Sequence, residues 1–337
     1  MADWTLRLGE GPLPDRALIG GKAWSIARMV DLGLPVPPAF VITTPACAAY
    51  KTDGFPSGLA QEIAEGIAWL EEQTGRTFGH GPSPLLVSVR SGAPVSMPGM
   101  MDTILNMGIT TQTAAALAVE TGSGSFAHDT HRRFYDLYAH IVLRSDIDGF
   151  DGVANPAEWD ETLAAAGLAI PAEPTDRLHA AVCAVFESWN SRRAKRYRLH
   201  HGIPDDLGTA VTVQAMVFGN LSDKSGTGVM FSRNPVTGDR APYGEYLARA
   251  QGEDVVSGKF TPRQLDAMRE TVPQAYDELL RAAETLEQSC GDVQDIEFTV
   301  QNGKLYLLQA RAAKRAPAAA VRFAVDMLDE IEIFEEG

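Results

Sequence analysis

Residues 293–311 read V-Q-D-I-E-F-T-V-Q-N-G-K-L-Y-L-L-Q-A-R, two strand-like segments joined by an Asn-Gly pair. Polar and apolar residues alternate in the first segment, so Asp295 and Glu297 lie on one face of the predicted strand. In the return segment Gln309 and Arg311 are also two residues apart. The pattern therefore predicts a β-hairpin with two pairs of polar side chains.

The length of the turn decides whether these two pairs meet. A two-residue turn opposes Gln301 to Lys304 and turns Gln309 away from Asp295. A three-residue loop opposes Val300 to Lys304 and sets Gln309 beside Asp295. We predict the three-residue loop, because it also produces a consistent apolar face. If Asp295 and Gln309 lie on opposite faces of the hairpin, the predicted convergence of the two polar pairs is wrong.

In the predicted register two carboxylates, an amide and a guanidinium converge. Hard oxygen ligands of this kind suit Mg²⁺, which typically takes one or two carboxylates together with phosphate oxygens. We therefore predict a metal site of Asp295, Glu297 and Gln309, beside which Arg311 clamps phosphate through its planar fork. The alternative is a surface hairpin with a charged outer face, and it is the better interpretation of a D-x-E pattern taken alone.

Beyond the hairpin, helical and strand-like patterns are mixed in an order that indicates an α+β or mixed α/β nucleotide-binding fold. Residues 110–205 carry mostly helical patterns, and β-rich sequence begins at Thr209. We therefore expect an N-terminal lobe over 1–109, a helical insert over 110–205 and a C-terminal lobe over 206–337. The expected strands are 40–42, 85–90, 210–218, 228–233, 243–250, 293–300 and 304–309, and the expected helices outside the insert include 22–31 and 273–289.

Two candidate cations stand at the ends of predicted elements. Gly20-Gly21-Lys22 opens a helix, where backbone N–H groups favour anions and the lysine adds charge. The frame is not that of a Walker A loop, and a Gly-Gly-Lys sequence by itself is more often a simple turn. Arg90 closes an otherwise apolar strand, where a functional arginine and a structural one are equally expected.

Three further segments are candidates for nucleotide contacts. Residues 96–103, S-M-P-G-M-M-D-T, form a Gly-hinged, Met-rich loop that can act as a lid, or else a packed surface loop. Residues 225–228 read as a Gly-rich turn whose phosphate-facing role is unspecific. Residues 213–217 can border a flat base, although by themselves they read better as core.

Bulk properties exclude several classes of protein. The 337 residues carry 29 Lys and Arg against 44 Asp and Glu, a formal charge of −15 that disfavours nucleic acid and anionic membranes as partners. The three cysteines form no C-x-x-C pair, so neither a disulfide framework nor a thiolate metal site is expected. The N-terminus lacks signal-peptide features and no apolar run approaches the roughly 20 residues of a membrane span. We expect a cytoplasmic protein.

Seven segments, taken in order, resemble the N-terminal region of the pyruvate phosphate dikinase family. They are G-G-K-A-W-S-I-A-R-M (20–29), L-L-V-S-V-R-S-G-A (85–93), S-M-P-G-M-M-D-T-I-L-N-M-G (96–108), V-Q-A-M-V-F-G (213–219), S-G-T-G-V-M-F-S-R-N-P-V-T-G (225–238), A-Q-G-E-D-V-V-S-G (250–258) and the hairpin quoted above. The likeness runs from Leu18 to Asp326 and is weakest in 145–180. Its longest strings favour this family over phosphoenolpyruvate synthase and rifampicin phosphotransferase.

The resemblance implies an ATP-grasp-like fold with a helical insert, in which two lobes close on Mg-ATP. It implies catalytic roles for Lys22, Arg90 and Arg311, and metal binding by Glu297 with Gln309, beside Asp295. Residues 96–103 would be the closing lid. The nucleotide-binding residues that it implies are Lys22, Arg90, Met101, Asp102, Thr103, Gln214, Met216, Val217, Thr227, Gly228, Glu245, Asp295, Gln309 and Arg311.

The resemblance also implies a reaction and a partner. In the family, ATP transfers its β,γ-phosphates to a histidine on a swivelling domain, and one phosphoryl group goes on to pyruvate. The family's T-x-G-G loop with its histidine does not occur here, so the acceptor is expected on another domain or chain. Two departures affect the phosphate end: Pro94 stands where the family usually has Arg, and Ala312-Ala313 where it has Asn-Gly.

Two other functions remain open at this point: a non-catalytic nucleotide sensor, and an ATP-dependent phosphotransferase with a different acceptor. The candidate metal and phosphate groups occur together, which favours catalysis, because a sensor need not keep them.

Overall fold

The computed structural model describes residues 4–95, 97, 99, 102–147, 150, 155–252, 254 and 261–335. The chain divides into two compact units. Unit 1 consists of Met1–Ala27 and Pro38–Met216, and unit 2 consists of Arg28–Pro37 and Val217–Gly337.

Unit 1 contains a five-stranded antiparallel sheet in the order β1-β2-β7-β5-β6. Its strands are β1 (Thr5–Arg7), β2 (Ala39–Ile42), β7 (Ala210–Ala215), β5 (Val87–Gly92) and β6 (Thr103–Met107). Every residue of β7 is buried, and this strand has a hydrogen-bonded neighbour on each edge. The structure thus differs from the predicted boundary at residue 206, which would separate β7 from the sheet to which it belongs.

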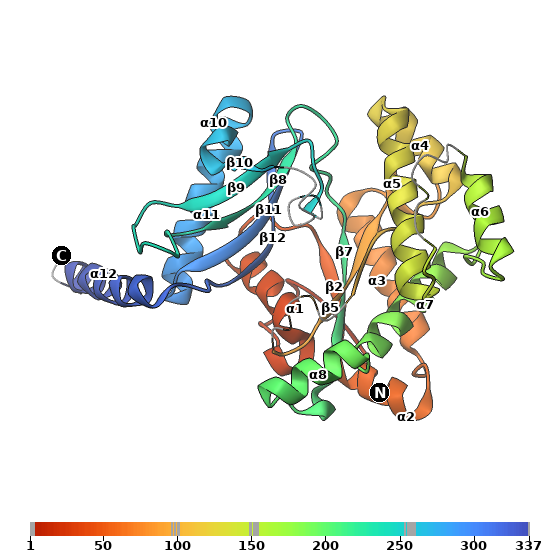
Figure 1. Ribbon diagram of the computed structural model, residues 1–337, viewed down its shortest axis with the longest axis horizontal. Helices are drawn as coiled ribbons and strands as arrows, with labels where there is room; N and C mark the ends of the chain where they lie inside the picture. The colour runs from red at the N-terminus through yellow and green to blue at the C-terminus, as the bar shows by residue number, and fades with distance from the viewer. Residues whose placement is uncertain are drawn as a thin grey trace. The chain divides into compact units, whose positions relative to one another are not determined.

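Helices cover the unit 1 sheet and extend beyond it (Figure 1). Near the sheet, α3 contacts β1 and β2, whereas α5 and α7 contact β6. The helices and short elements of unit 1 are α1 (Arg16–Asp31, which continues into unit 2), α2 (Thr44–Asp53), α3 (Leu59–Thr74), β3 (Thr77–Phe78), β4 (Pro84–Leu85), α4 (Thr111–Thr121), α5 (Gly124–Leu137), the π-helix η1 (Tyr138–Val142), α6 (Pro156–Ala165), α7 (Pro174–Ser188), α8 (Arg192–His201) and η2 (Asp205–Leu207).

An aromatic cluster joins α5 to α6 in the helical part of unit 1. The ring of Trp159, which is fully buried, lies 5.0 Å from that of Tyr135 and 5.3 Å from that of His131 between ring centroids. Burial lowers the pKa of His131 to about 4, and the charges of Arg177 and His128 act in the same direction. His131 is therefore a neutral core residue at physiological pH.

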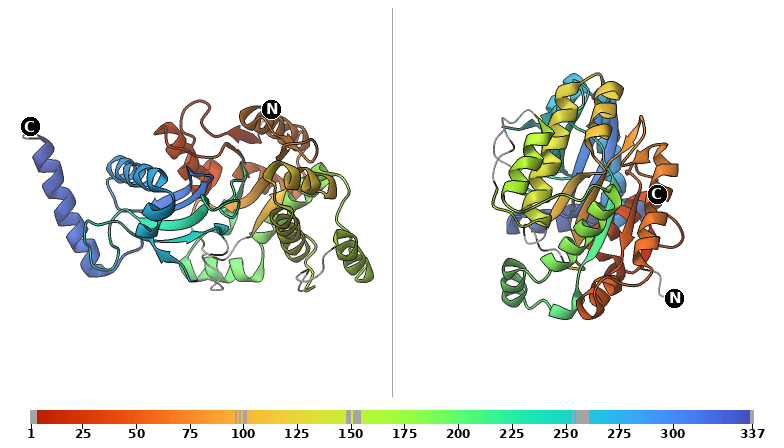
Figure 2. Two further views of the ribbon diagram at one scale, coloured as in Figure 1. Left: turned by 90° about the horizontal axis from the view of Figure 1, so that it is seen from above. Right: turned by 90° about the vertical axis from the view of Figure 1, so that its right-hand side faces the viewer.

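Unit 2 contains a second antiparallel sheet in the order β10-β9-β8-β11-β12. The sheet buries one face against α11, which lies along it in Figure 1. In the left view of Figure 2, α12 runs out from the end of β12. The elements are β8 (Gly226–Phe231), β9 (Tyr243–Ala248), β10 (Arg263–Gln264), η3 (Leu265–Ala267), α10 (Met268–Thr271), α11 (Pro273–Cys290), β11 (Gln294–Gln301), β12 (Lys304–Ala312) and α12 (Pro317–Glu335).

The predicted α+β class is confirmed. The predicted strands and the helix over 273–289 occur within three residues of their predicted ends, whereas α1 begins at Arg16, six residues before the helix predicted over 22–31. One local prediction is wrong: the Gly-rich segment 225–228 is not a turn, because Gly226–Phe231 form strand β8. None of the helices in the described ranges has the length and apolar character to span a lipid bilayer.

Candidate functional site

The hairpin β11–β12 closes with a two-residue turn. Gln301 pairs with Lys304, and both turn residues have left-handed backbones, with φ of 51° at Asn302 and 82° at Gly303. Asn-Gly is the pair best suited to a turn that requires positive φ at both positions. The predicted three-residue loop is therefore wrong.

A β-bulge in β12 then shifts the register of the hairpin. Phe298 pairs with Leu307, but the preceding residue of β11, Glu297, pairs with Gln309. Leu308 is the extra residue, with no partner across the strand pair. Without it, the two-residue turn would place Glu297 opposite Leu308 and turn Gln309 toward the apolar face.

As a result, the four polar side chains of the hairpin share one face. Glu297 is directly opposite Gln309, and Asp295 is directly opposite Arg311. Residues directly opposite each other in an antiparallel pair point to the same side of the sheet. The predicted convergence is present, although the bulge produces it rather than a longer loop.

Charge complementarity holds Arg311 in this group. Its Nε donates to Oδ2 of Asp295 at 2.8 Å, and its Nη2 lies 3.9 Å from Oε1 of Glu297. Burial alone lowers the pKa of Arg311, but the hydrogen bond and charge of Asp295, together with the charge of Glu297, outweigh it and raise the pKa. Arg311 therefore carries a fixed positive charge beside two carboxylates.

The donor set of this face fits Mg²⁺ better than a softer metal. Asp295, Glu297 and Gln309 offer carboxylate and amide oxygens, and Glu297 keeps 33% of its side chain exposed. In the described part of the chain no cluster of three or more His, Cys, Asp or Glu residues could hold a metal. Mg²⁺ needs no such cluster, since it is often held by one or two carboxylates plus water and phosphate oxygens.

Glu245 extends the same polar face to a third strand. It pairs with Val229 of β8, which in turn pairs with Glu297 of β11. Glu245 therefore lies in one row with Glu297 and Gln309 across the sheet, and its side chain is exposed. This row links residues that are more than 60 positions apart in the chain.

Thr227 and Gly228 have roles within the sheet. The hydroxyl of Thr227 donates to the Phe298 carbonyl at 3.0 Å and lies 3.2 Å from the hydroxyl of Thr299. Gly228 pairs with Phe298 and so lies on the face opposite to Glu297. A Cβ there would approach the Phe298 ring to 2.7 Å, which explains the glycine. Nucleotide contacts by this pair stay a prediction.

In unit 1, Gly20, Gly21 and Lys22 form a corner, the Gly-Gly-Lys corner, which contacts the end of β5. Gly20, with φ of 77°, interrupts the helical backbone of α1. A Cβ at Gly20 would lie 2.0 Å from the carbonyl oxygen of Gly92, so only glycine fits. The N–H of Gly21 donates to the Ala93 carbonyl at 3.0 Å. Lys22 therefore begins a helical segment right beside the strand that carries the second candidate cation.

That cation, Arg90, belongs to one polar face of the unit 1 sheet. It is opposite Thr103 of β6, and its Nη1 donates to Oε1 of Gln214 at 3.3 Å. Gly92, two residues further along β5, shares this face and lies beside the Lys22 side chain. Four of the predicted site residues, Lys22, Arg90, Thr103 and Gln214, are thus brought to one face of one sheet.

The predicted adenine-binding strand ends where the two units divide. Gln214 is buried, and the N–H of Met216 donates to the Leu86 carbonyl at 2.8 Å within unit 1. Val217 is the first residue of the second segment of unit 2. Contacts of these residues with an adenine stay a prediction.

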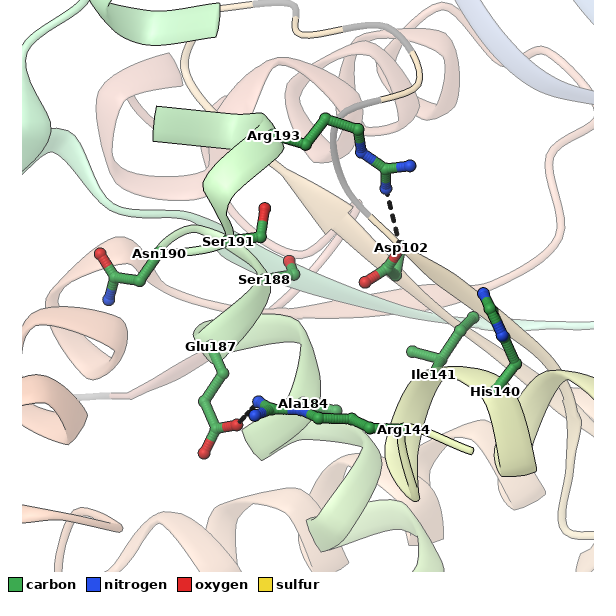
Figure 3. A pocket seen from close by; sticks show the side chains of 10 residues that line it. All are labelled: Asp102, His140, Ile141, Arg144, Ala184, Glu187, Ser188, Asn190, Ser191 and Arg193. Carbon is green, nitrogen blue, oxygen red and sulfur yellow. Dashed lines mark hydrogen bonds and ion pairs between the residues drawn. The ribbon is translucent and has the colours of Figure 1, made fainter. Parts of the chain in front are cut away.

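Part of the predicted lid lies outside the described residues, including Met101. Of the rest, Met97 is buried against Trp189 and Ala194. Asp102 lines a cavity of about 610 Å³ beside η1, the end of α7 and the start of α8 (Figure 3). Its Oδ1 lies 3.5 Å from Nη2 of Arg193.

The cavity itself is polar and balanced in charge. Besides the pair of Asp102 and Arg193, Arg144 forms an ion pair with Glu187 across it (Figure 3). Both guanidinium groups in the described lining are thus already compensated. The walls of this cavity come from segments far apart in the chain, so no single sequence pattern indicates it.

The α+β fold, with candidate phosphate-binding cations on one sheet and carboxylates on another, fits the class of ATP-grasp-type nucleotide-binding domains. Comparison with protein families agrees with this class. The family model described as "Pyruvate phosphate dikinase, AMP/ATP-binding domain" matches residues 51–277 and 268–331. The chain belongs to this family.

Curated relatives carry the same name. The chain is 46% identical to pyruvate, phosphate dikinase 1, chloroplastic, of Zea mays over 95% of its length, and 43% identical to pyruvate, phosphate dikinase of Clostridium symbiosum over 100%. Identity to the protein of this name from Rhizobium meliloti (strain 1021) is 42%, again over 100%. The chain spans only 36%, 41% and 42% of these relatives, respectively.

Proposed function

We propose that this chain binds Mg-ATP and transfers its β,γ-phosphates to a histidine on a separate domain or chain, ultimately for the interconversion of pyruvate and phosphoenolpyruvate. The observation that carries the proposal is the single polar face on which Asp295, Glu297, Gln309 and Arg311 converge. Membership of an AMP/ATP-binding domain family supports the identity of the nucleotide.

Unit 2 would supply the metal end of the reaction. Asp295, Glu297 and Gln309 would hold Mg²⁺ through their oxygens, and the ion, when bound, offsets charge on the phosphate oxygens. Arg311 is positioned by Asp295, which leaves part of its fork for a phosphate: Nη2 is still 3.9 Å from Glu297. An arginine presented in this way can bind phosphate in a defined orientation.

Unit 1 would supply the two remaining positive groups. Lys22 is held at the corner fastened to β5, and Arg90 lies on the same sheet face, oriented by Gln214. In the transfer step, an imidazole nitrogen of the acceptor bonds to the β-phosphorus. The bond from this phosphorus to the oxygen that bridges to the α-phosphate breaks, and AMP leaves with that oxygen. Fixed positive charges favour the step by stabilising charge on the phosphates that move.

A transfer assay tests the proposal. The chain is mixed with Mg²⁺, γ-labelled ATP and a separately expressed phosphohistidine domain. Acid-labile, base-stable label on that domain is the expected result, lost in Glu297→Gln and retained in Glu284→Gln, a matched change on the exposed side of α11. Tight ATP binding without label on any histidine would contradict transfer and favour a nucleotide sensor. Label on a different added acceptor would favour another phosphotransferase.

A further inference from the structure

Arg16 lies over the Gly-Gly-Lys corner of unit 1. A Cβ placed on Gly21 would be 3.1 Å from Nη2 and 3.4 Å from Nε of Arg16, and 3.5 Å from the carbonyl oxygen of Ala93. The flat guanidinium therefore occupies the space that the missing side chain of Gly21 leaves open. It stands next to the residue that precedes Lys22.

A tryptophan, rather than an acid, holds Arg16 in place. Its Cζ lies 5.7 Å from the centre of the Trp24 ring, within the range of a cation–π contact. Among the described residues no carboxylate pairs with Arg16, and its side chain is exposed. Arg7 of the same unit makes a similar contact, 5.8 Å from Trp69, but it also pairs with Glu10 at 3.5 Å. Arg16 is thus a positioned charge without a counter-ion among the residues that the structure describes.

The neighbourhood of Arg16 favours an anion. Lys22 adds a second positive charge, and the helical segment that restarts after Gly20 directs its positive end to the same corner. In a chain of formal charge −15, such a local concentration of positive charge is also the arrangement that attracts an anionic ligand.

We propose that Arg16 binds the β- or γ-phosphate of ATP, together with Lys22. The inference rests on the proposed function and names a further phosphate-binding residue for it. Arg16 adds a planar fork to the point charge of the lysine, and therefore fixes the orientation of the phosphate as well as attracting it. Gly21 belongs to the same proposed phosphate-binding site, because its lack of a side chain leaves room for the guanidinium of Arg16.

Equilibrium titration of the full chain with Mg-ATP and with AMP tests this role. Arg16→Gln is expected to weaken ATP binding about tenfold, the effect of one charge-assisted hydrogen bond, and to leave AMP binding unchanged. Arg7→Gln is the matched control, since it removes an arginine that also stacks on tryptophan in unit 1. It should change neither affinity.

A second variant keeps the charge but displaces it. Gly21→Ala should weaken ATP binding to a similar extent, and the double variant should bind no more weakly than Arg16→Gln alone. Thermal melting shows whether each variant remains folded. If the wild type binds ATP and Arg16→Gln binds it within twofold, or if ATP and AMP weaken equally, the role of Arg16 is overturned while the proposed function stands. A wild type that does not bind ATP would overturn the proposed function itself.

Discussion

Deleting Leu308 tests the register on which the metal site depends. The deletion joins Leu307 directly to Gln309, so that a regular ladder pairs Phe298 with Leu307 and Glu297 with Gln309. These are the pairs that the bulged hairpin already forms. The deletion should therefore remove the bulge and leave the polar face intact.

The structure sets the expected change in stability. Leu308 is half-buried, and a fully buried leucine contributes about 1.5–3 kcal/mol, so losing this side chain costs about 1 kcal/mol. A regular ladder regains a backbone hydrogen bond of about 1 kcal/mol. The net free energy of unfolding should change by less than about 1 kcal/mol. Leu308→Ala loses the side chain but keeps the bulge, so it should be the less stable of the two variants.

Denaturant unfolding measures the stabilities, and titration with Mg-ATP measures the site. We expect both variants to bind Mg-ATP within a few-fold of the wild type. A deletion variant less stable than Leu308→Ala by more than about 3 kcal/mol would contradict the role of Leu308 as the extra residue of the bulge. Loss of Mg²⁺-dependent binding in a folded deletion variant would contradict the register of the polar face.

Three further perturbations have defined outcomes. Glu297→Gln should weaken ATP binding at least about tenfold in the presence of Mg²⁺ but not in its absence, which parallel titrations would measure. A melting temperature lowered by more than about 8 °C would instead mean that Glu297 has a structural role. Gly20→Ala should lower the free energy of unfolding by about 3 kcal/mol in chemical denaturation, because its Cβ would lie 2.0 Å from a carbonyl oxygen of β5. Gly54→Ala is the control: Gly54 has a similar φ and no atom within 4 Å of the added Cβ, so this variant should lose only about 1 kcal/mol. The lowered pKa of His131 means that the folded state binds fewer protons, so stability should fall by up to about 3 kcal/mol as the pH falls from about 6.5 to about 4. Urea unfolding at several pH values measures this dependence. It should disappear in His131→Gln and persist in His140→Gln, which changes an exposed histidine. If the free energy of unfolding depended on pH equally in the wild type and in His131→Gln, the role of His131 would be contradicted.

Short-range sequence patterns determine much of the local structure of this protein. The alternation in 293–301 places Asp295 and Glu297 on one face, whatever the rest of the chain does, because side chains in a strand alternate with period two. The Asn302-Gly303 pair likewise carries its own turn type, and the two-residue turn could have been predicted from it. The ordered family strings by themselves indicate the nucleotide-binding class.

Tertiary contacts decided what these patterns left open. The sequence offers no local sign that Leu308 is the extra residue: Leu307 and Leu308 are identical, and only packing distinguishes them. Leu307 is buried with Phe298 in the unit 2 core, whereas Gln309 pairs with Glu297 on the opposite face. Leu307 can face the core while Gln309 pairs with Glu297 only if the residue between them, Leu308, is left unpaired.

Other outcomes depend on contacts between distant segments in the same way. Gly20 and Gly92 meet because α1 packs against the end of β5, and the sequence pattern of either segment alone reads as an ordinary turn or strand end. The sequence by itself thus determined which chemical groups the chain presents and the local faces on which they lie. The tertiary structure decided which of those faces meet and in what register, because pairing and close approach depend on burial that only segments far apart in the chain can supply together.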